Sequence, residues 1–211
     1  RQIGPANMSG RIADISIDDE DPSLWYVGTA GAGLLKTTNH GVRMEHLFDG
    51  ETTSSVGAVA HSPSDKNTVW VGTGEPNPRN SVSYGNGVYK STDGGKTWEH
   101  KGLEKTFQIA RILIHPKNPE VVYVGAAGRL YGTSRERGVY KTTDGGENWE
   151  QVLYIDDNTG VIDMIMNPED PETIIVAMWD RMRDGFDSWP GSVPKPDGVD
   201  GYDPVRKYGA G

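Results

Sequence analysis

The chain has 211 residues, of which 35% are hydrophobic and 28 are glycine, a composition that suits one turn-rich domain and argues against a helical bundle. Its formal net charge is -9 without clustered Lys or Arg, which excludes nucleic acid as a ligand because phosphate binding needs grouped basic residues. It contains no cysteine, and no apolar run approaches the roughly 20 residues that cross a bilayer. We therefore expect no disulfide, no cysteine-type metal site and no membrane-spanning segment.

In chain order, each of four periods begins with two short segments typical of strands. The first segments are 10–17 (GRIADISI), 56–62 (VGAVAHS), 109–115 (IARILIH) and 161–167 (VIDMIMN). The second segments, each led by Asp or Asn, are 21–31 (DPSLWYVGTAG), 65–75 (DKNTVWVGTGE), 118–128 (NPEVVYVGAAG) and 170–180 (DPETIIVAMWD). Short apolar runs rich in β-branched and aromatic residues and bounded by turn residues predict β-strands.

A third and a fourth strand follow in the first three periods. The stretch GVYKSTDGGKTWE at 87–99 returns as GVYKTTDGGENWE at 138–150, and a weaker copy, LLKTTNHGVRM, stands at 34–44. Four strands in about 50 residues is the period of a propeller blade. The sequence therefore predicts an all-β fold, a β-propeller of four-stranded antiparallel blades.

The blades are expected at 10–53, 54–106 and 107–157, and residues 158–211 supply an incomplete fourth blade with a long loop. About 3.5 blades leave an apolar face and an open strand edge, because each blade packs on neighbours at both sides. We expect residues 1–211 to form one partial propeller within a larger ring of seven or more blades. The rest of a longer chain or a second chain would close that ring, and residues 1–9 are expected to add a ring-closing strand.

The repeated turn between the third and fourth strands is interpreted as structural. An Asp carboxylate accepts several N–H groups of a tight turn, Gly adopts the positive φ that the turn needs, and we expect the Trp to cover its own hairpin as an apolar lid. The residues assigned to this role are Ser91, Asp93, Gly95, Thr97 and Trp98 in one copy and Thr142, Asp144, Gly146 and Trp149 in the next. The first copy has Asn39 and Met44 where the others have Asp and Trp.

These turns resemble the Asp-box, or BNR repeat, of sialidases, sortilin-type receptors and related propellers. Together with the run IGPANMSGRIADISID at 3–18, the chain is similar to large bacterial proteins labelled glycosyl hydrolase with BNR repeats or sortilin N-terminal-like. The resemblance implies a propeller located outside the cell, in the periplasm or in the cell envelope. Because the same repeat occurs in hydrolases, receptors and assembly factors, it indicates a fold rather than an activity.

Candidate ligand-binding residues lie in the loops between the second and third strands. Antiparallel strands place these loops on the face opposite to the repeated turns, and long loops on one face are typical of a binding surface. Arg suits carboxylates, and aromatic rings suit sugars or peptide side chains, although the same residues could tie the loops to one another. The candidates are Arg79, Asn80, Tyr84, Arg129, Tyr131, Trp179, Asp180, Arg181, Arg183 and Trp189.

The alternative to a binding module is a glycoside hydrolase, sialidase-like or xyloglucanase-like. Such enzymes normally need two carboxyl groups at the scissile bond, and Glu75 and Asp163 are the candidates. The chain also resembles xyloglucan-cleaving endoglucanases, whose catalytic Asp lies in a TDVGG-like segment after the second strand of an N-terminal blade. Ala30 stands at that position here. The primary prediction is therefore a non-catalytic extracellular module that binds a peptide, a protein or a glycan.

A third set of polar residues falls in equivalent register on the innermost strands. They are Asp14, Arg111 and Asp163, and the second period has Ala58 at the equivalent position. These charges could line a polar channel. Ion pairing across the seams between blades is favoured, because buried charges need partners. The acidic segments 18–22 and 195–204 do not match a calcium-binding loop. No metal or other cofactor is expected.

Overall fold

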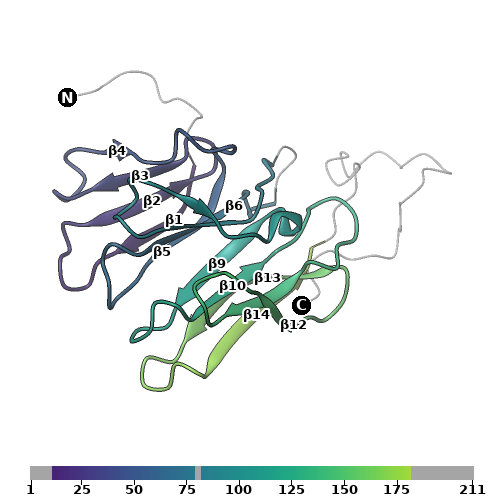
Figure 1. The fold of residues 1–211 in the computed structure, drawn as a ribbon. Coiled ribbons are helices and arrows are strands. Elements are labelled where there is room, and N and C mark those ends of the chain that lie inside the picture. Colours follow the sequence, from purple (N-terminus) through teal and green to yellow (C-terminus); the bar gives the residue numbers. More distant parts are fainter. Residues whose placement is uncertain (1–10, 79–81, 182–211) are drawn as a thin grey trace, which may run out of the picture.

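The structure, a computed structural model, describes residues 11–78 and 82–181 (Figure 1). Within them, three four-stranded antiparallel sheets and one two-stranded sheet follow one another along the chain. The first sheet contains β1 (Ile12–Ile17), β2 (Trp25–Thr29), β3 (Leu34–Thr37) and β4 (Glu45–His46). The second contains β5 (Val56–His61), β6 (Val69–Thr73), β7 (Val88–Ser91) and β8 (Glu99–His100). The third contains β9 (Ile109–Ile114), β10 (Val122–Ala126), β11 (Gly138–Thr142) and β12 (Glu150–Leu153), and the last contains β13 (Thr159–Met166) and β14 (Ile174–Asp180).

The predicted all-β fold is confirmed. Each complete sheet has its strands in sequence order, as the repeat requires of a propeller blade. The one helical segment among the described residues is a 3-10 turn, η1 (Glu104–Thr106), between the second and third sheets. No helix in these parts of the chain is long and apolar enough to cross a membrane.

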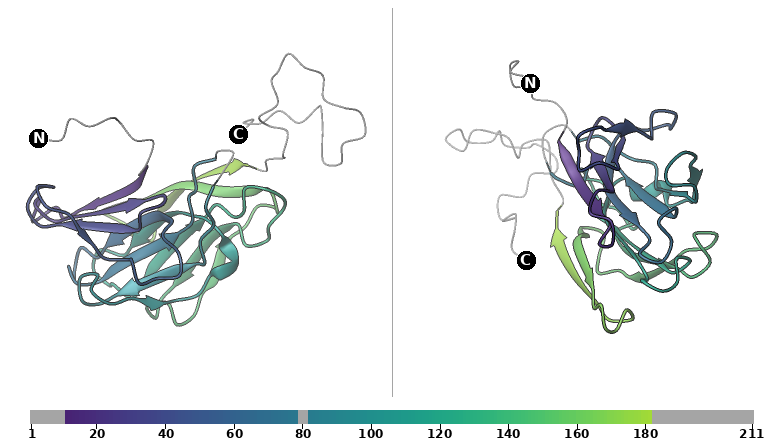
Figure 2. Two further views of the ribbon diagram at one scale, coloured as in Figure 1. Left: turned by 90° about the horizontal axis from the view of Figure 1, so that it is seen from above. Right: turned by 90° about the vertical axis from the view of Figure 1, so that its left-hand side faces the viewer.

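The sheets pack face to face, so the apolar core is divided among the interfaces between them (Figure 2). Tyr26 and Leu34 of the first sheet meet Val56 and Val71 of the second in one cluster. Equivalent clusters lie between the second and third sheets and between the third and the last. Every sheet therefore depends on its neighbours for burial of its apolar side chains.

A glycine in the second strand of each four-stranded sheet makes this close packing possible. A Cβ built on Gly28 would lie 2.7 Å from Val56 Cγ1, and a Cβ on Gly125 would lie 2.7 Å from Val161 Cγ1. In the same position of the second sheet, a Cβ on Gly72 would lie 2.4 Å from a side-chain atom of Ile109. The repeated Val–Gly pair of the sequence is thus a socket for the first strand of the following sheet.

The two ends of the array expose apolar side chains. Ile12 and Ile17 of β1 are 58% and 47% exposed, and Ile165 and Ile175 of the last sheet are 55% and 67% exposed. In the interior of the array the corresponding strands are buried between two sheets, as the burial of β5 and β10 shows. Two unpartnered apolar faces at the ends are what the sequence predicts for part of a larger ring.

Candidate functional site

The turns after β7 and β11 are held by the Asp carboxylates that the repeat singled out. Asp93 Oδ1 accepts the N–H groups of Lys96 and Thr97, each at 2.9 Å, and Oδ2 accepts the Thr97 hydroxyl at 2.7 Å. The side-chain hydroxyl of Ser91 donates to the same carboxylate at 2.8 Å. These donors, led by the Thr97 side chain, lower the pKa of Asp93 well below its usual range.

The second and first copies of the turn use the same geometry. Asp144 accepts the Asn148 N–H at 3.0 Å and its side-chain N–H at 2.8 Å, which together with Thr142 lower its pKa to about 2. In the first copy Asn39 Oδ1 accepts the Arg43 N–H at 2.9 Å, so an amide oxygen replaces the carboxylate. The assigned glycines of the two later turns have positive φ, 93° at Gly95 and 91° at Gly146, as the sequence predicted.

The tryptophans of these turns also contact the preceding sheet, which the sequence did not predict; the Trp98 ring lies near its own turn as well, since a Cβ on Gly95 would lie 3.4 Å from it. Trp98 Nε1 donates to the Leu47 carbonyl at 2.8 Å, and Trp149 Nε1 donates to the Lys101 carbonyl at 2.7 Å. Both acceptors belong to the preceding sheet, and the Trp149 ring packs edge-on against Trp70 of that sheet at 5.9 Å between centroids. The indole rings are therefore contacts between sheets, because the interface offers both an apolar surface and a free carbonyl.

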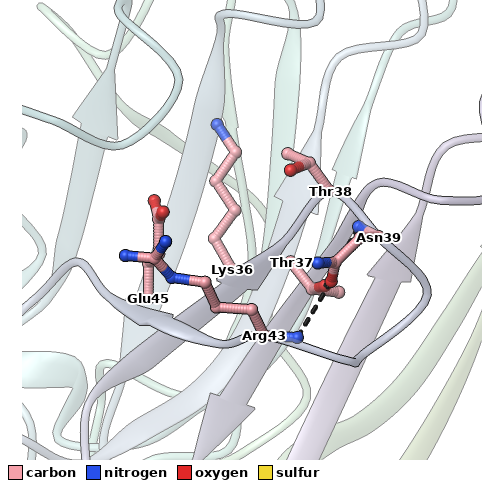
Figure 3. A pocket seen from close by; sticks show the side chains of 6 residues that line it. All are labelled: Lys36, Thr37, Thr38, Asn39, Arg43 and Glu45. Atoms are coloured by element: carbon pink, nitrogen blue, oxygen red, sulfur yellow. Dashed lines mark hydrogen bonds between the residues drawn. The ribbon is translucent and has the colours of Figure 1, made fainter.

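A polar pocket lies on this turn face of the first sheet (Figure 3). Its lining consists of Lys36, Thr37, Thr38, Asn39, Arg43 and Glu45. The Lys36 ammonium donates to the Gly94 carbonyl at 2.9 Å, and Thr37 donates to Asn39 Oδ1 at 2.9 Å. Its main polar groups thus hold the turn and the neighbouring sheet, and we assign it a structural role.

Glu75, a candidate catalytic acid, lies on the opposite face, directly after β6. Its side chain is only 1% exposed, and both carboxylate oxygens accept hydrogen bonds from Arg11, from Nε at 2.7 Å and from Nη2 at 2.5 Å. Because a bidentate arginine occupies both oxygens, they are not free to meet a substrate. Glu75 ties its loop to the chain that enters the first sheet.

Asp163, the second catalytic candidate, belongs to a set of ion pairs on the inner strands. Arg111 Nη1 lies 3.2 Å from Asp14 Oδ1, and Arg111 Nε lies 3.2 Å from Asp163 Oδ1. All three residues stand just beyond a β-bulge in the first strand of their sheets, where Asp14 faces Gly28 and Asp163 faces Ala177. The favoured interpretation, pairing across the seams, is confirmed; burial raises the pKa of Asp14 despite these contacts.

An aromatic and guanidinium column stands among the loops on the face that carries Glu75. The Tyr84 ring meets the Phe107 ring edge-on at 5.3 Å, and the Arg129 guanidinium lies 4.7 Å from the centroid of the Phe107 ring. Tyr84 is 44% exposed. Phe107 has a φ of 59° and a ψ of -40°, a sparsely populated combination outside the left-handed helical region that is costly for a bulky residue and that accumulates at functional sites.

Arg137, which the sequence did not single out, is fully buried in the loops of the third sheet. Its guanidinium donates to the carbonyls of Ala127, Arg129 and Asp157, and it forms no ion pair with another described residue. Burial lowers its pKa to about 10. In the sequence, Arg137 could have been found from its position directly before the repeated GVYK stretch. The equivalent residue of the second sheet is Asn86, which also joins its loop to β7 through hydrogen bonds.

Two of the predicted loop residues belong to a strand instead. Trp179 and Asp180 lie within β14, because the pairing of β13 with β14 extends to the contact of Thr159 with Asp180. Arg181, the next residue, is 3% exposed, and its Nη2 donates to Gln108 Oε1 at 2.8 Å. Arg181 is therefore buried between sheets rather than displayed on a loop.

The remaining candidates separate into two groups. Tyr131 is half-buried in the loop after β10, beside the residues that hold Arg137. Arg79, Asn80, Arg183 and Trp189 lie outside the described residues, as does the expected closing strand at 1–9. In the described parts of the chain, no three His, Asp or Glu side chains gather in a group that could hold a metal ion.

Comparison with known proteins defines the class of fold. No family model matches the chain. A probable oligoxyloglucan-reducing end-specific xyloglucanase of Neosartorya fischeri is 33% identical over 103 residues, which cover 44% of this chain and 10% of that protein. The chain thus spans about a tenth of the length of this curated relative.

Solved structures with the same fold are propellers from two groups of proteins. The GH74 enzyme of Niastella koreensis has a TM-score of 0.60 at 20% identity, covering 80% of this chain and 26% of that one. An ancestral GH74 enzyme has a TM-score of 0.61 at 20% identity, covering 82% and 22%. YCF48 bound to D1 peptide has a TM-score of 0.52 at 18% identity, covering 76% and 46%. The chain is therefore a set of β-propeller blades similar in fold to parts of these proteins.

Proposed function

We propose that this chain is a non-catalytic, glycan-binding part of a larger propeller and that its ligand lies on the column formed by Tyr84, Phe107 and Arg129. The observation that carries the proposal is the strained Phe107, held between an exposed tyrosine ring and a guanidinium on the loop face. Exposed aromatic rings suit the apolar faces of sugars, and Arg supplies planar donors for hydroxyl oxygens. The similarity to a xyloglucanase makes xyloglucan oligosaccharides the first ligands to test.

The proposal includes the setting of the module. The exposed isoleucines at both ends of the array support a ring that is completed by further blades from the same or another chain. The Asp-box resemblance of the two turns supports a location outside the cell, in the periplasm or in the cell envelope. Fractionation of the source cells, followed by immunodetection, tests this location; recovery in the cytoplasm alone would contradict it.

The binding test is isothermal titration calorimetry with xyloglucan oligosaccharides. Replacing Tyr84 by Ala should weaken binding roughly 2- to 10-fold, the equivalent of the ~0.5–1.5 kcal/mol of an aromatic contact, whereas Tyr84→Phe should retain affinity because the ring remains. Trp25→Ala, on the turn face, is the control and should bind as the parent does. Equal losses in Tyr84→Ala and Trp25→Ala, or binding of peptides but no glycans, would overturn the proposal.

A glycoside hydrolase is the second candidate because the curated relative is named as a xyloglucanase. Against it stands Arg11, which occupies both oxygens of the buried Glu75; Asp163 contacts Arg111 through one oxygen and its side chain is 58% exposed. We expect Glu75→Gln to lower the thermal midpoint, Tm, because it breaks the buried contact with Arg11, and we expect no turnover of xyloglucan in the parent protein. Turnover that disappears in Glu75→Gln or Asp163→Asn while Tm stays constant would establish the hydrolase instead.

A further inference from the structure

The seam between the third and last sheets contains a group of buried hydrogen-bond donors without partners. Arg181 is 3% exposed, and its Nε and Nη1 groups make no hydrogen bond. Gln108 is fully buried; its Oε1 accepts from Arg181 Nη2 at 2.8 Å, and its Nε2 group has no acceptor. Nearly all buried polar groups in native proteins have a partner, so these unused donors need an explanation.

The charge of Arg181 is also uncompensated by the described residues. Arg181 forms no ion pair with any of them. Besides burial, the charge of Arg137 lowers the pKa of Arg181. The Arg137 guanidinium is itself fixed by hydrogen bonds to three backbone carbonyls. Asp180, Asp156 and Asp157 act on Arg137 rather than on Arg181. A buried guanidinium beside a second one is costly unless an anion neutralises it.

The donors are fixed by the surrounding backbone, as a binding site requires. The Arg181 N–H donates to the Asn158 carbonyl at 3.2 Å, and the Ala127 N–H donates to the Gln108 carbonyl at 2.9 Å. Both donor residues are thus held by the loops at the ends of β10 and β13. Asn158, whose carbonyl accepts the Arg181 N–H, also has a buried side-chain Oδ1 without a hydrogen-bond partner, which suits a hydroxyl group of a ligand.

We propose that Arg181 and Gln108 form a binding site for a carboxylate, with a hydroxylated acid such as a hexuronate as the sugar form of the ligand. The site presents donors from a guanidinium and an amide, and a carboxylate is an acceptor-only group that matches them. A monoanion is favoured over a phosphate dianion, because the cost of taking charge out of water rises steeply with charge. The site does not include Tyr84 or Phe107, so this proposal can be tested independently of glycan binding at the column of Tyr84, Phe107 and Arg129.

The test is the Tm of the purified protein after prolonged incubation with sodium glucuronate, acetate, phosphate or glucose at constant ionic strength. Incubation is needed because the donors are shielded from water and the covering side chains must open. Glucuronate and acetate should raise the Tm of the parent, since a ligand that binds only the folded state stabilises it. Equal shifts with phosphate or with glucose would overturn the carboxylate assignment.

Two variants with the same change of charge separate binding from general stability. Arg181→Met should remove the response to glucuronate, whereas Arg135→Met, an exposed arginine that lies over the Tyr154 ring, should keep it. Without ligand, Arg181→Met should have a Tm equal to or above that of the parent, because an unpaired buried charge has been removed. If the parent does not respond to any carboxylate and Arg181→Met lowers Tm, a group of the chain itself fills the site and the proposal fails.

A more conservative variant keeps the test decisive if Arg181→Met does not fold. Arg181→Lys retains the positive charge but lacks the planar set of donors, so glucuronate should raise its Tm less than that of the parent. An undiminished response in Arg181→Lys would show that charge alone attracts the anion and would overturn the proposed donor set. Loss of xyloglucan binding is not expected in either variant, which distinguishes this site from the column at Tyr84.

Discussion

The glycine socket between the first two sheets gives a sharp test of how the blades are held together. A Cβ added to Gly28 would lie 2.7 Å from Val56 Cγ1 but 3.5 Å from Val56 Cβ. Gly28→Ala should therefore overpack the interface and cost about 1–3 kcal/mol. For a domain of this size that loss corresponds to a fall in Tm of roughly 2–12 °C.

Removing the opposing methyl groups should relieve the clash. Val56→Ala alone should cost about 2 kcal/mol through the lost burial and the cavity, yet the added Cβ of Gly28→Ala meets only ordinary contact once Cγ1 is absent. The double variant should thus be about as stable as Val56→Ala, with a coupling energy of about 1–3 kcal/mol. Urea denaturation followed by circular dichroism measures all three variants.

Gly31→Ala is the matched control, because a Cβ there meets nothing within 4 Å. It should be neutral or stabilise the protein by up to about 1 kcal/mol, since alanine has less freedom to lose on folding. Two outcomes would refute the socket. In one, the losses of unfolding free energy in Gly28→Ala and Val56→Ala add up in the double variant. In the other, Gly28→Ala is as stable as Gly31→Ala.

Two further predictions concern the repeated turns. Trp149→Phe keeps an aromatic ring but loses the hydrogen bond to the Lys101 carbonyl, so it should destabilise the protein by about 1 kcal/mol. Trp149→Ala should destabilise it by about 3–5 kcal/mol, because the ring is lost as well. Thermal denaturation measures both variants, and equal losses of stability would refute a role for the N–H group. The pKa of Asp144 is lowered to about 2 when folded, so its carboxylate stabilises the protein above pH ~4 and this contribution is lost as the pH falls through about 2. The Tm difference between the parent and Asp144→Asn should therefore shrink from pH 5 to pH 2, and a constant difference would contradict the assignment.

Much of the fold could be predicted because its determinants are local. The spacing of apolar residues, the Asp- and Gly-bearing turns and the period of the repeat are consequences of short-range backbone preferences, and each complete sheet has the predicted strand order. The register of Asp14, Arg111 and Asp163 followed from the repeat alone. The partners of Trp98 and Trp149 did not, because they lie on another sheet.

The candidate site was less predictable for the same reason. A residue after a strand can lie on a loop surface or between sheets, and a single sequence carries no record of which arginine meets Glu75 or which glutamine meets Arg181. The strain at Phe107 also arises from how two sheets are joined, and no motif marks it.

The sequence by itself determined the repeat, the strands and the turns, since hydrogen bonding and conformational preference act within a few residues. Only the tertiary structure decided which polar groups are satisfied across the seams. It paired Glu75 with Arg11 and Asp163 with Arg111, and it brought Tyr84, Phe107 and Arg129 together. Burial and pairing depend on contacts between distant segments, and these contacts exist only once the sheets have packed against one another.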